Sequence, residues 1–301
     1  MARLRFHTLD VFTDTPFGGN PLAVVLDADV LSGAQMQTIA AEFNLSETVF
    51  VLQPAKAGRH RRKLRIFTPR AELPFAGHPT VGASYLLAAR NLLDVDPADP
   101  VMVLEEGVGD VPVTVRFGRE GPASTQMSVP RMPERGPEPP PRGELAAMLS
   151  LTESDLLPGP AGYSCGVPFL FIQIRSREAI ARVSLRTDLS EKLLSGGWAK
   201  GVFLFTTDTV SKDAQVHARV FAPALGIAED PATGGAASAL AGFLHDQAPR
   251  DGRRRWLIEQ GFEMGRPSHI ELEADTAGGK IVAVRISGSS VLVSEGWITV
   301  G

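Results

Sequence analysis

Two short stretches decide the fold of this chain: Gly77-His78-Pro79-Thr80-Val81-Gly82 and Glu229-Asp230-Pro231-Ala232-Thr233-Gly234. Each places a proline at the start of an apolar segment rich in small residues, where its missing N–H costs a helix nothing. The segment before each stretch is also repeated, because Arg65-Ile66-Phe67-Thr68-Pro69 is echoed by Arg219-Val220-Phe221-Ala222-Pro223. Further upstream, Gly19-Asn20-Pro21-Leu22 matches Gly166-Val167-Pro168-Phe169. Three matches in one order favour a duplication, so we expect two like domains facing each other.

A proline-rich run separates the two halves. Residues 129–141 carry prolines that lack backbone donors and resist both helix and central strand. We therefore predict a linker over residues 129–143, an N-terminal domain over residues 1–128 and a C-terminal domain over residues 129–301.

Hydrophobic periodicity and turn signals predict the elements within each half. Ser32 is expected to cap a helix over residues 32–43, with Gln35 completing a capping box. The other predicted helices cover residues 79–90, 143–149 and 232–244. The predicted strands cover residues 4–11, 22–26, 48–52, 64–67, 101–104, 111–117, 169–174, 198–206, 215–221, 270–274, 280–287 and 291–300.

Composition indicates an ordinary globular protein. Apolar residues make up 44% of the 301 residues and charged residues 21%, and no apolar run reaches the 18 residues of a membrane span. The N-terminus lacks the features of a signal peptide, so we expect a cytoplasmic protein without a membrane partner. The formal net charge of −4 argues against a nucleic-acid partner. The basic runs at residues 60–63 and 253–255 are interpreted as solvated turns before strands.

Several classes of chemistry are excluded by what the sequence lacks. The single cysteine, Cys165, permits no internal disulfide and no mechanism that needs two thiols. The histidines are scattered and form no His-Glu-x-x-His motif, so we expect no metal site. Complete dinucleotide and phosphate-binding loops are also missing from the sequence.

The two helix starts are the first candidates for a site. Unpaired N–H groups and the positive end of the helix dipole would hold a carboxylate or a developing enolate. Gly77, Gly234 and Gly235 are the expected donors, although the same small residues could serve helix packing. His78 could be an acid, a base or a hydrogen-bond donor, and Asp230 its counterpart, but each could also be a helix cap.

The third candidate is Glu47, in Asn44-Leu45-Ser46-Glu47-Thr48-Val49-Phe50. It lies between a predicted helix and an apolar strand, where partial removal from water would raise the pKa of a carboxylate toward neutrality. Such a group can take and return a proton. An exposed turn glutamate would have the same local sequence.

Ordered motifs in both halves resemble those of the PhzF-like phenazine-biosynthesis isomerase family. The matching stretches run from about residue 5 to the C-terminus. They are residues 17–24 (Phe-Gly-Gly-Asn-Pro-Leu-Ala-Val), 44–50, 67–69, 72–80 (Glu-Leu-Pro-Phe-Ala-Gly-His-Pro-Thr), 229–234, 259–261 and 265–268.

The resemblance implies an α+β fold of two pseudo-symmetric diaminopimelate-epimerase-like domains. Each would be a curved, mostly antiparallel sheet around a central helix, with the last strand, at about 289–301, packing back on the first domain. It implies an isomerase that uses no metal or organic cofactor, acts on a small acidic substrate and forms a homodimer. Glu47 would shuttle a proton, His78 and Asp230 would line the substrate, and Asn20 and Ser46 would help to bind it.

The sequence departs from the family in one substrate contact and from its relatives in the catalytic groups. The phenazine enzyme has Ser after the glycine that matches Gly234, whereas this chain has Gly235, so the phenazine substrate is not implied. The related epimerases and proline racemases carry a cysteine at each helix start, and this chain has none there. The expected function is a proton-moving isomerase, with an epimerase or a catalytically weak ligand-binding protein as alternatives.

Overall fold

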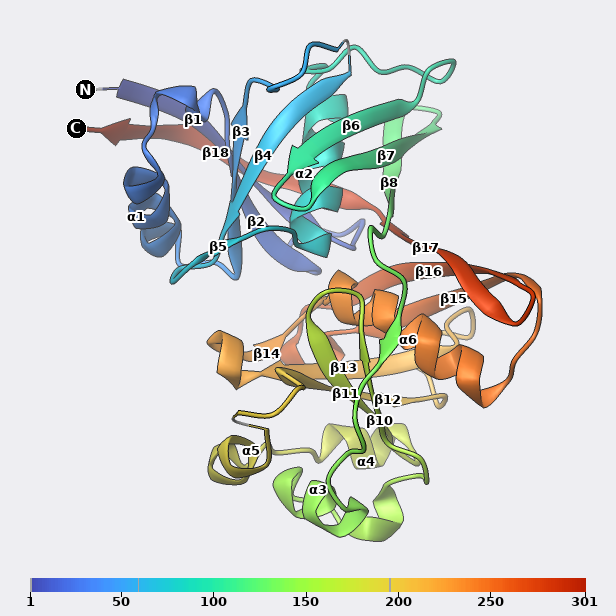
Figure 1. The fold of residues 1–301 in the computed structure, drawn as a ribbon. Coiled ribbons are helices and arrows are strands. Elements are labelled where there is room, and N and C mark those ends of the chain that lie inside the picture. Colours follow the sequence, from blue (N-terminus) through green and yellow to red (C-terminus); the bar gives the residue numbers. More distant parts are fainter. Residues whose placement is uncertain (1, 59, 195) are drawn as a thin grey trace. The chain divides into compact units, whose positions relative to one another are not determined.

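The structure is a computed structural model that describes residues 2–58, 60–194 and 196–301. The chain divides into two compact units. Unit 1 comprises Met1–Pro130 and Ser287–Gly301, and unit 2 comprises Arg131–Ile286. Each unit is built as a sheet with helices on both faces (Figure 1).

The sheet of unit 1 is mostly antiparallel. Its strands pair in the order β18–β1–β2–β3–β4–β6–β7–β8, and only the pairs β2–β3 and β4–β6 are parallel. The strands are β1 (Ala2–Val11), β2 (Asn20–Val25), β3 (Glu47–Leu52), β4 (Arg61–Phe67), β5 (Glu72–Leu73), β6 (Val101–Glu106), β7 (Gly109–Gly118), β8 (Gly121–Ser128) and β18 (Ser290–Val300).

A central helix determines the curvature of this sheet. Helix α2 (Gly77–Ala89) contacts β18, β1, β2 and β3 as well as β7 and β8, so strands from both ends of the sheet wrap around it (Figure 1). Its residues are accordingly buried on nearly every side. The opposite face of the sheet packs against η1 (Ala28–Val30) and α1 (Gly33–Phe43) through a second core that includes Met36, Phe50 and Phe67. The capping box predicted at Ser32 and Gln35 is confirmed.

Unit 2 repeats this plan. From β10 to β16 the successive neighbours β10–β11–β12–β13–β15–β16 alternate between antiparallel and parallel in the same order as β1–β2–β3–β4–β6–β7. The duplication predicted from the motifs is therefore confirmed. The strands are β9 (Glu134–Arg135), β10 (Ala161–Ser164), β11 (Pro168–Gln173), β12 (Gly201–Thr206), β13 (Val216–Ala222), β14 (Ile227–Asp230), β15 (Gly252–Gln260), β16 (Ser268–Ala277) and β17 (Lys280–Gly288), which ends in unit 1.

The helices of unit 2 also lie on two faces. Helix α6 (Gly234–Gln247) is the buried central helix and contacts β9, β10, β11 and β16. Helices α3 (Arg142–Met148), α4 (Arg177–Ala181) and α5 (Thr187–Leu194) cover the other face through an apolar core. The single-turn helices are η2 (Glu153–Asp155), η3 (Pro223–Leu225) and η4 (Phe262–Met264). No helix in the described ranges is long and apolar enough to cross a membrane.

The two predicted helix starts were wrong by two residues each. Helix α2 begins at Gly77 with Ala76 as its N-cap, and α6 begins at Gly234 with Thr233 as its N-cap. Proline is tolerated at the third position of α2 because the N–H groups of a first helical turn have no acceptor within the helix. The N-cap alternatives for His78 and Asp230 are therefore wrong.

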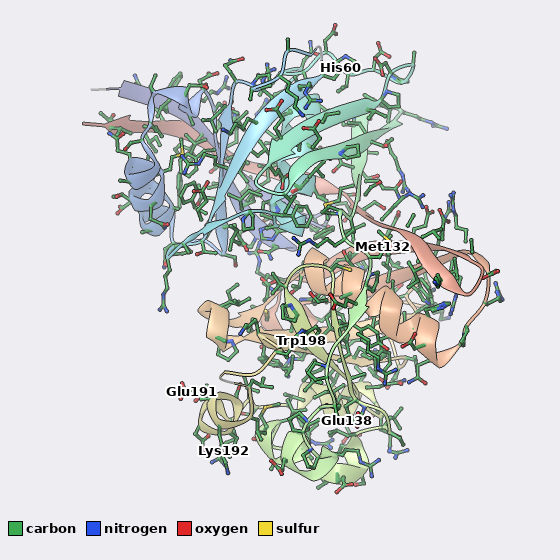
Figure 2. All side chains as sticks on the ribbon, in the orientation of Figure 1. His60, Met132, Glu138, Glu191, Lys192 and Trp198 are labelled. Carbon is green, nitrogen blue, oxygen red and sulfur yellow. The ribbon has the colours of Figure 1, made fainter. Side chains whose placement is uncertain are left out.

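The interpretation of the basic runs as turns was also wrong. Arg61–Lys63 belong to β4, and Arg253–Arg255 belong to β15. Ion pairs with acidic side chains on neighbouring strands accommodate these charges in a sheet: Arg61 lies 3.1 Å from Glu105 and Arg253 lies 2.7 Å from Asp275. In the proline-rich run, Met132 and Glu138 are exposed (Figure 2), whereas β9 forms a two-residue pairing with β10.

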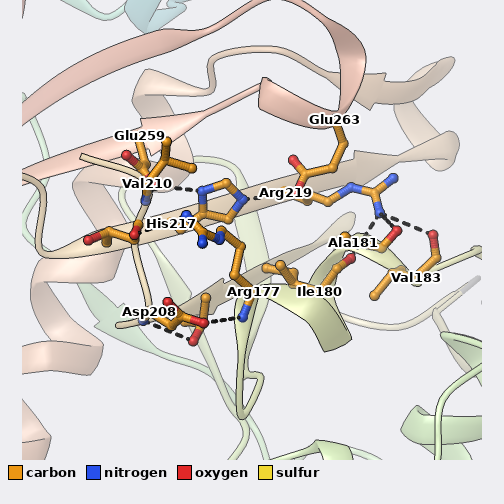
Figure 3. A network of polar contacts seen from close by, with 12 residues as sticks. Arg177, Ile180, Ala181, Val183, Asp208, Val210, His217, Arg219, Glu259 and Glu263 are labelled. Carbon is orange, nitrogen blue, oxygen red and sulfur yellow. Dashed lines mark hydrogen bonds and ion pairs between the residues drawn. The ribbon is translucent and has the colours of Figure 1, made fainter. Parts of the chain in front are cut away.

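A buried charged cluster holds the end of β15 in unit 2 (Figure 3). The ring of His217, on β13, contacts Glu259 through Nδ1 at 2.7 Å and Glu263 through Nε2 at 2.9 Å. Glu259 is fully buried and also accepts hydrogen bonds from the backbone N–H groups of Val210 and Ser211. Two carboxylate partners require both ring nitrogens to donate, so His217 is an imidazolium. Burial lowers the pKa of His217, but the hydrogen bonds and charges of Glu263 and Glu259 outweigh it and raise the pKa overall.

His217→Gln should remove a pH-dependent part of the stability. A folded-state pKa above the ordinary 6.5 means that the contribution of His217 is fully present below pH 6.5 and is lost as pH rises through the folded-state pKa. We expect a loss of about 3–5 kcal/mol at pH 6, because Glu259 remains as an unpaired buried charge, and a smaller loss at alkaline pH. Urea unfolding from pH 5 to 10 measures this difference. His269→Gln, at an exposed histidine, is the control. A pH-independent loss would contradict the assignment.

The loop before β2 requires glycine at position 19. Gly19 has φ of +60°, and a Cβ there would lie 2.3 Å from the carbonyl oxygen of Val11. Gly19→Ala should therefore destabilise the protein by more than the roughly 1–2 kcal/mol of a left-handed alanine. Gly278→Ala supplies the control, because Gly278 has φ of +58° with no atom near the added Cβ. Equal free energies of unfolding for the two variants would show that the close approach at Gly19 has no energetic cost.

Candidate functional site

The first cluster of candidate residues lies in unit 1, where a strand start meets a helix start. Glu47 is the first residue of β3 and His78 the second residue of α2, and α2 packs against β3. Both side chains are buried, and Nε2 of His78 lies 3.4 Å from Oε2 of Glu47. The structure thus brings together two of the three predicted catalytic residues. Local sequence alone could not have excluded a surface position for Glu47.

The imidazole of His78 is neutral. Burial lowers its pKa from 6.5 to about 3. A neutral imidazole has one N–H donor and one acceptor nitrogen, so His78 can offer Glu47 a hydrogen bond in either direction. It cannot be a cationic acid near neutral pH.

Three further predicted residues lie at the starts of β2, β3 and α2, the elements that position this pair. Asn20 begins β2, which runs parallel to β3 with Leu22 opposite Glu47, so Asn20 and Ser46 lie at the same end of two adjacent strands. Asn20 is fully buried, which is unusual for an asparagine. Gly77, the first residue of α2, is also buried.

The repeat shows that this cluster has no copy in unit 2. Leu22 lies opposite Glu47 in the β2–β3 pair, and Phe169 lies opposite Gly201 in the matching β11–β12 pair. Gly201 is therefore the counterpart of Glu47, as Val167 is of Asn20. At this position, the start of β3 in unit 1 carries a carboxylate and the matching start of β12 in unit 2 carries glycine.

The second cluster surrounds Asp230 in unit 2. Asp230 ends β14 and is buried, and its Oδ2 accepts a hydrogen bond of 2.6 Å from the hydroxyl of Thr233. Gln260 at the end of β15 supports this turn: its Nε2 donates to the carbonyl oxygen of Asp230 at 2.7 Å, and its Oε1 accepts from the N–H of Thr233. The prediction missed Gln260 as a supporting residue, although its motif was recognised. Its role depends on a contact 30 residues away along the chain.

The position after Gln260 requires glycine for a structural reason. Gly261 has φ of +78°, and a Cβ there would lie 2.6 Å from the carbonyl oxygen of Pro231. Together with the His217 cluster on Glu259, this close approach ties the end of β15 to the Asp230 turn. The charged cluster thus contributes to the position of Asp230.

The start of α6 presents two predicted glycines in different environments. Gly234 is buried, whereas a Cβ added at Gly235 would meet no atom within 4 Å. Cys165 follows β10 in unit 2, and burial raises the pKa of its thiol to about 12, so it is protonated and unreactive. The described residues contain no group of three or more His, Cys, Asp or Glu side chains that could hold a metal ion.

Comparisons with known proteins identify the family. The sequence model of the phenazine biosynthesis-like proteins (PhzC-PhzF) matches residues 9–296. The chain is 40% identical to an uncharacterized isomerase of Mesorhizobium japonicum, over 98% of this chain and 99% of the relative. It is 36% identical to the trans-2,3-dihydro-3-hydroxyanthranilate isomerase of Pseudomonas aeruginosa, over 97% of this chain and 98% of the relative.

Solved structures agree with this assignment. The fold matches the PhzF-family phenazine biosynthesis protein of Bacillus anthracis with a TM-score of 0.90 and 25% identity, covering 100% of both chains. A hydroxyproline epimerase of Agrobacterium vitis shares the fold alone, with a TM-score of 0.63 and 11% identity over 98% of this chain and 92% of the epimerase. The predicted diaminopimelate-epimerase-like α+β fold is therefore confirmed, and the chain belongs to the PhzF-like phenazine biosynthesis family of isomerases.

Proposed function

We propose that this chain catalyses a cofactor-independent proton shift on a small unsaturated carboxylic acid, with Glu47 as the group that takes and returns the proton. The observation that carries the proposal is the buried contact of 3.4 Å between Glu47 and a neutral His78. General acid–base catalysis needs one positioned group that takes and returns a proton. We assign this role to Glu47, because the imidazole of His78 stays neutral.

The proposed reaction proceeds in two proton transfers. The carboxylate of Glu47 removes a proton from a carbon next to the double bond, and the C–H electrons move into a dienolate conjugated with the substrate carboxylate. Glu47, now protonated, exchanges its proton with solvent and delivers a proton to the far end of the former double bond. The substrate keeps its atoms, the double bond has moved, and Glu47 is again a carboxylate. Neutral His78, whose Nε2 lies 3.4 Å from Oε2 of Glu47, has one donor and one acceptor nitrogen and can therefore bond to either form of the carboxyl group.

The helix starts have the chemistry to bind the charged part of the substrate. The N–H groups at Gly77 of α2 and at Gly234 and Gly235 of α6 have no acceptor within their helices, and they lie at positive dipole ends. Donors of this kind stabilise carboxylates and enolates. We propose that Asn20 and Ser46 assist in binding and that Asp230 contributes to the same reaction.

Asp230→Asn should then lower kcat.

The proposal does not include the two-thiol chemistry of proline racemases. His78 lies in the first turn of α2, Asp230 lies at the end of β14, four residues before α6, and Cys165 is a buried, protonated thiol. An epimerase and a ligand-binding protein with little catalysis are the alternatives, and their products distinguish them. An isomerase places solvent hydrogen at a new carbon as the double bond migrates, an epimerase inverts one centre, and a binder exchanges nothing.

The homodimer and the cytoplasmic location stay predictions.

Glu47→Gln is expected to slow the proton exchange strongly. Wild-type protein incubated in D2O with a panel of small α,β- and β,γ-unsaturated carboxylic acids should introduce deuterium at a migrated position, which 1H NMR detects. The variant should be slower by roughly 10²–10⁴-fold, the usual contribution of a general acid or base. Glu42→Gln, at an exposed glutamate of α1, should keep the wild-type rate. A folded Glu47→Gln variant that exchanges deuterium as fast as the wild type would refute the proposed role.

Gly235→Ser tests the substrate difference from the phenazine enzyme. We expect the wild-type chain to turn over trans-2,3-dihydro-3-hydroxyanthranilate, the substrate named for the Pseudomonas relative, poorly. The open space at Gly235 accommodates a serine, whose hydroxyl should raise kcat/KM by roughly tenfold, the value of one hydrogen bond to a charged group. Gly235→Ala adds the Cβ without the hydroxyl and should not raise it. Equal gains in the two variants would contradict a hydroxyl contact.

A further inference from the structure

A second buried acid lies beneath the helix start of unit 1. Glu106 is the last residue of β6, and its side chain is buried. Its Oε1 lies 2.7 Å from the hydroxyl oxygen of Thr80, in α2 two residues after His78, and its Oε2 is buried without a hydrogen-bond partner among the described residues. An ionised carboxylate in such a place would be strongly destabilised unless a cation balanced it.

Proton counting around Thr80 shows which form Glu106 takes. The hydroxyl oxygen of Thr80 lies 2.7 Å from two oxygens, the carbonyl oxygen of Ala76 and Oε1 of Glu106. A hydroxyl has one proton, so it can donate a full hydrogen bond to only one of these oxygens. A carbonyl oxygen carries no proton. Both contacts are satisfied when Thr80 donates to Ala76 and a protonated Glu106 donates to Thr80.

The charged groups around Glu106 do not compensate a negative charge. The adjacent Glu105 points to the other side of the strand, where it pairs with Arg61 at 3.1 Å, and Arg61 also pairs with Asp110 at 2.8 Å. None of the described titratable groups on the packed elements is paired with Glu106. These groups are Arg61, Arg62, Lys63 and Arg65 of β4, Glu105 of β6, Asp110 and Arg116 of β7, and His78 and Tyr85 of α2.

We propose that Glu106 is held as an uncharged carboxylic acid at neutral pH and that its O–H bond to Thr80 positions the first turn of α2, which carries His78. Glu106 is a positioning residue, because it acts through Thr80. The turn between β6 and β7, which follows Glu106, also contacts the segment before α2, since the N–H of Val108 donates to the carbonyl oxygen of Pro74 at 3.1 Å. The inference rests on the proposed function only in the role of His78. The protonation state of Glu106 stands independently of that function.

The pH dependence follows from burial. Desolvation raises the pKa of Glu106 from 4.5 to about 8, against a smaller opposing effect of the Thr80 hydrogen bond. Below pH 8 the acid donates to Thr80. Above pH 8 it becomes a carboxylate that can only accept, so the hydroxyl of Thr80 can no longer satisfy both Ala76 and Glu106. Activity that depends on this turn should therefore fall as pH rises through about 8.

The protonation state can be measured without a substrate. In protein labelled with 13C at the glutamate side-chain carboxyl, the resonance of Glu106 is the one missing from Glu106→Gln. We expect this resonance to titrate with a midpoint near pH 8. A midpoint near the ordinary 4.5 would overturn the assignment of Glu106 as a neutral acid, whatever the activity of the protein.

Positioning is tested with the unsaturated acid that the wild type turns over. Glu106→Gln keeps a donor for Thr80 and cannot ionise, so it should retain kcat within about threefold at pH 7 and lose the decline above pH 8. Glu106→Leu removes the donor and should lower kcat by about tenfold with little change in KM, because the turn that carries His78 is no longer fixed. If Glu106→Leu does not fold, Thr80→Val, which removes the acceptor instead, should give the same kcat effect.

Thr125→Val is the matched control. Thr125 is another buried threonine whose hydroxyl bonds to α2, at the carbonyl oxygen of Val81, but it has no acid partner among the residues that the structure describes. It should keep the wild-type decline above pH 8. A wild-type pH profile in Glu106→Gln, or wild-type kcat in Glu106→Leu and Thr80→Val, would overturn the positioning role. Wild-type exchange in Glu47→Gln would instead refute the proposed function and leave the NMR titration of Glu106 unaffected.

Discussion

Removal of the first turn of α2 from water is the constraint on which the chemistry of unit 1 depends. The sheet wraps around this helix, so the imidazole of His78 is desolvated and stays neutral. The contact of 3.4 Å between His78 and Glu47 is therefore not a pair of opposite charges. The same burial keeps Glu106, whose side chain contacts the hydroxyl of Thr80, protonated at neutral pH. One packing arrangement thus determines the protonation of two groups at this helix start.

The two units share one duplicated plan but carry different residues at matching positions. The pairing order of the strands and the position of the central helix are repeated, which is enough to reproduce two helix starts with unpaired N–H groups. The strand-start carboxylate is not repeated, because Gly201 stands where unit 1 has Glu47. A Cβ at Gly201 would lie 2.7 Å from the carbonyl oxygen of Phe221, so this position in unit 2 excludes any side chain. The strand frame is repeated in the two units, whereas the contact between Glu47 and His78 is not.

Unit 2 supports its turn in a different manner. Asp230 depends on Gln260 and Thr233, and the end of β15 that carries Gln260 is held by the imidazolium of His217 between Glu259 and Glu263. The buried charge of Glu259 is tolerated there because this carboxylate accepts from His217 and from the N–H groups of Val210 and Ser211. In unit 1 the equivalent task is performed by a neutral acid and a hydroxyl. The two units therefore stabilise similar backbones in different ways, unit 2 with charged side chains and unit 1 with an uncharged acid.

Sequence by itself determined the fold class, the duplication and the family. The duplication follows from the order of the Gly/Pro motifs along the chain, and the fold class and the family follow from the resemblance of these ordered motifs to the PhzF-like family. It also identified Glu47, His78 and Asp230, but only through the family motifs, since a turn glutamate and two possible caps carry no local mark of function. The capping box at Ser32 and Gln35 was predictable because all its partners lie within four residues.

Tertiary structure alone decided what depends on contacts between distant residues. The basic runs at residues 61–63 and 253–255 lie in strands because acidic side chains on adjacent strands pair with them. Gln260 and Glu106 have roles only through partners 26 to 30 residues away. The neutral state of His78 follows from burial by strands from both ends of a sheet. Desolvation is a property of the packed surroundings, and no local pattern of residues encodes it.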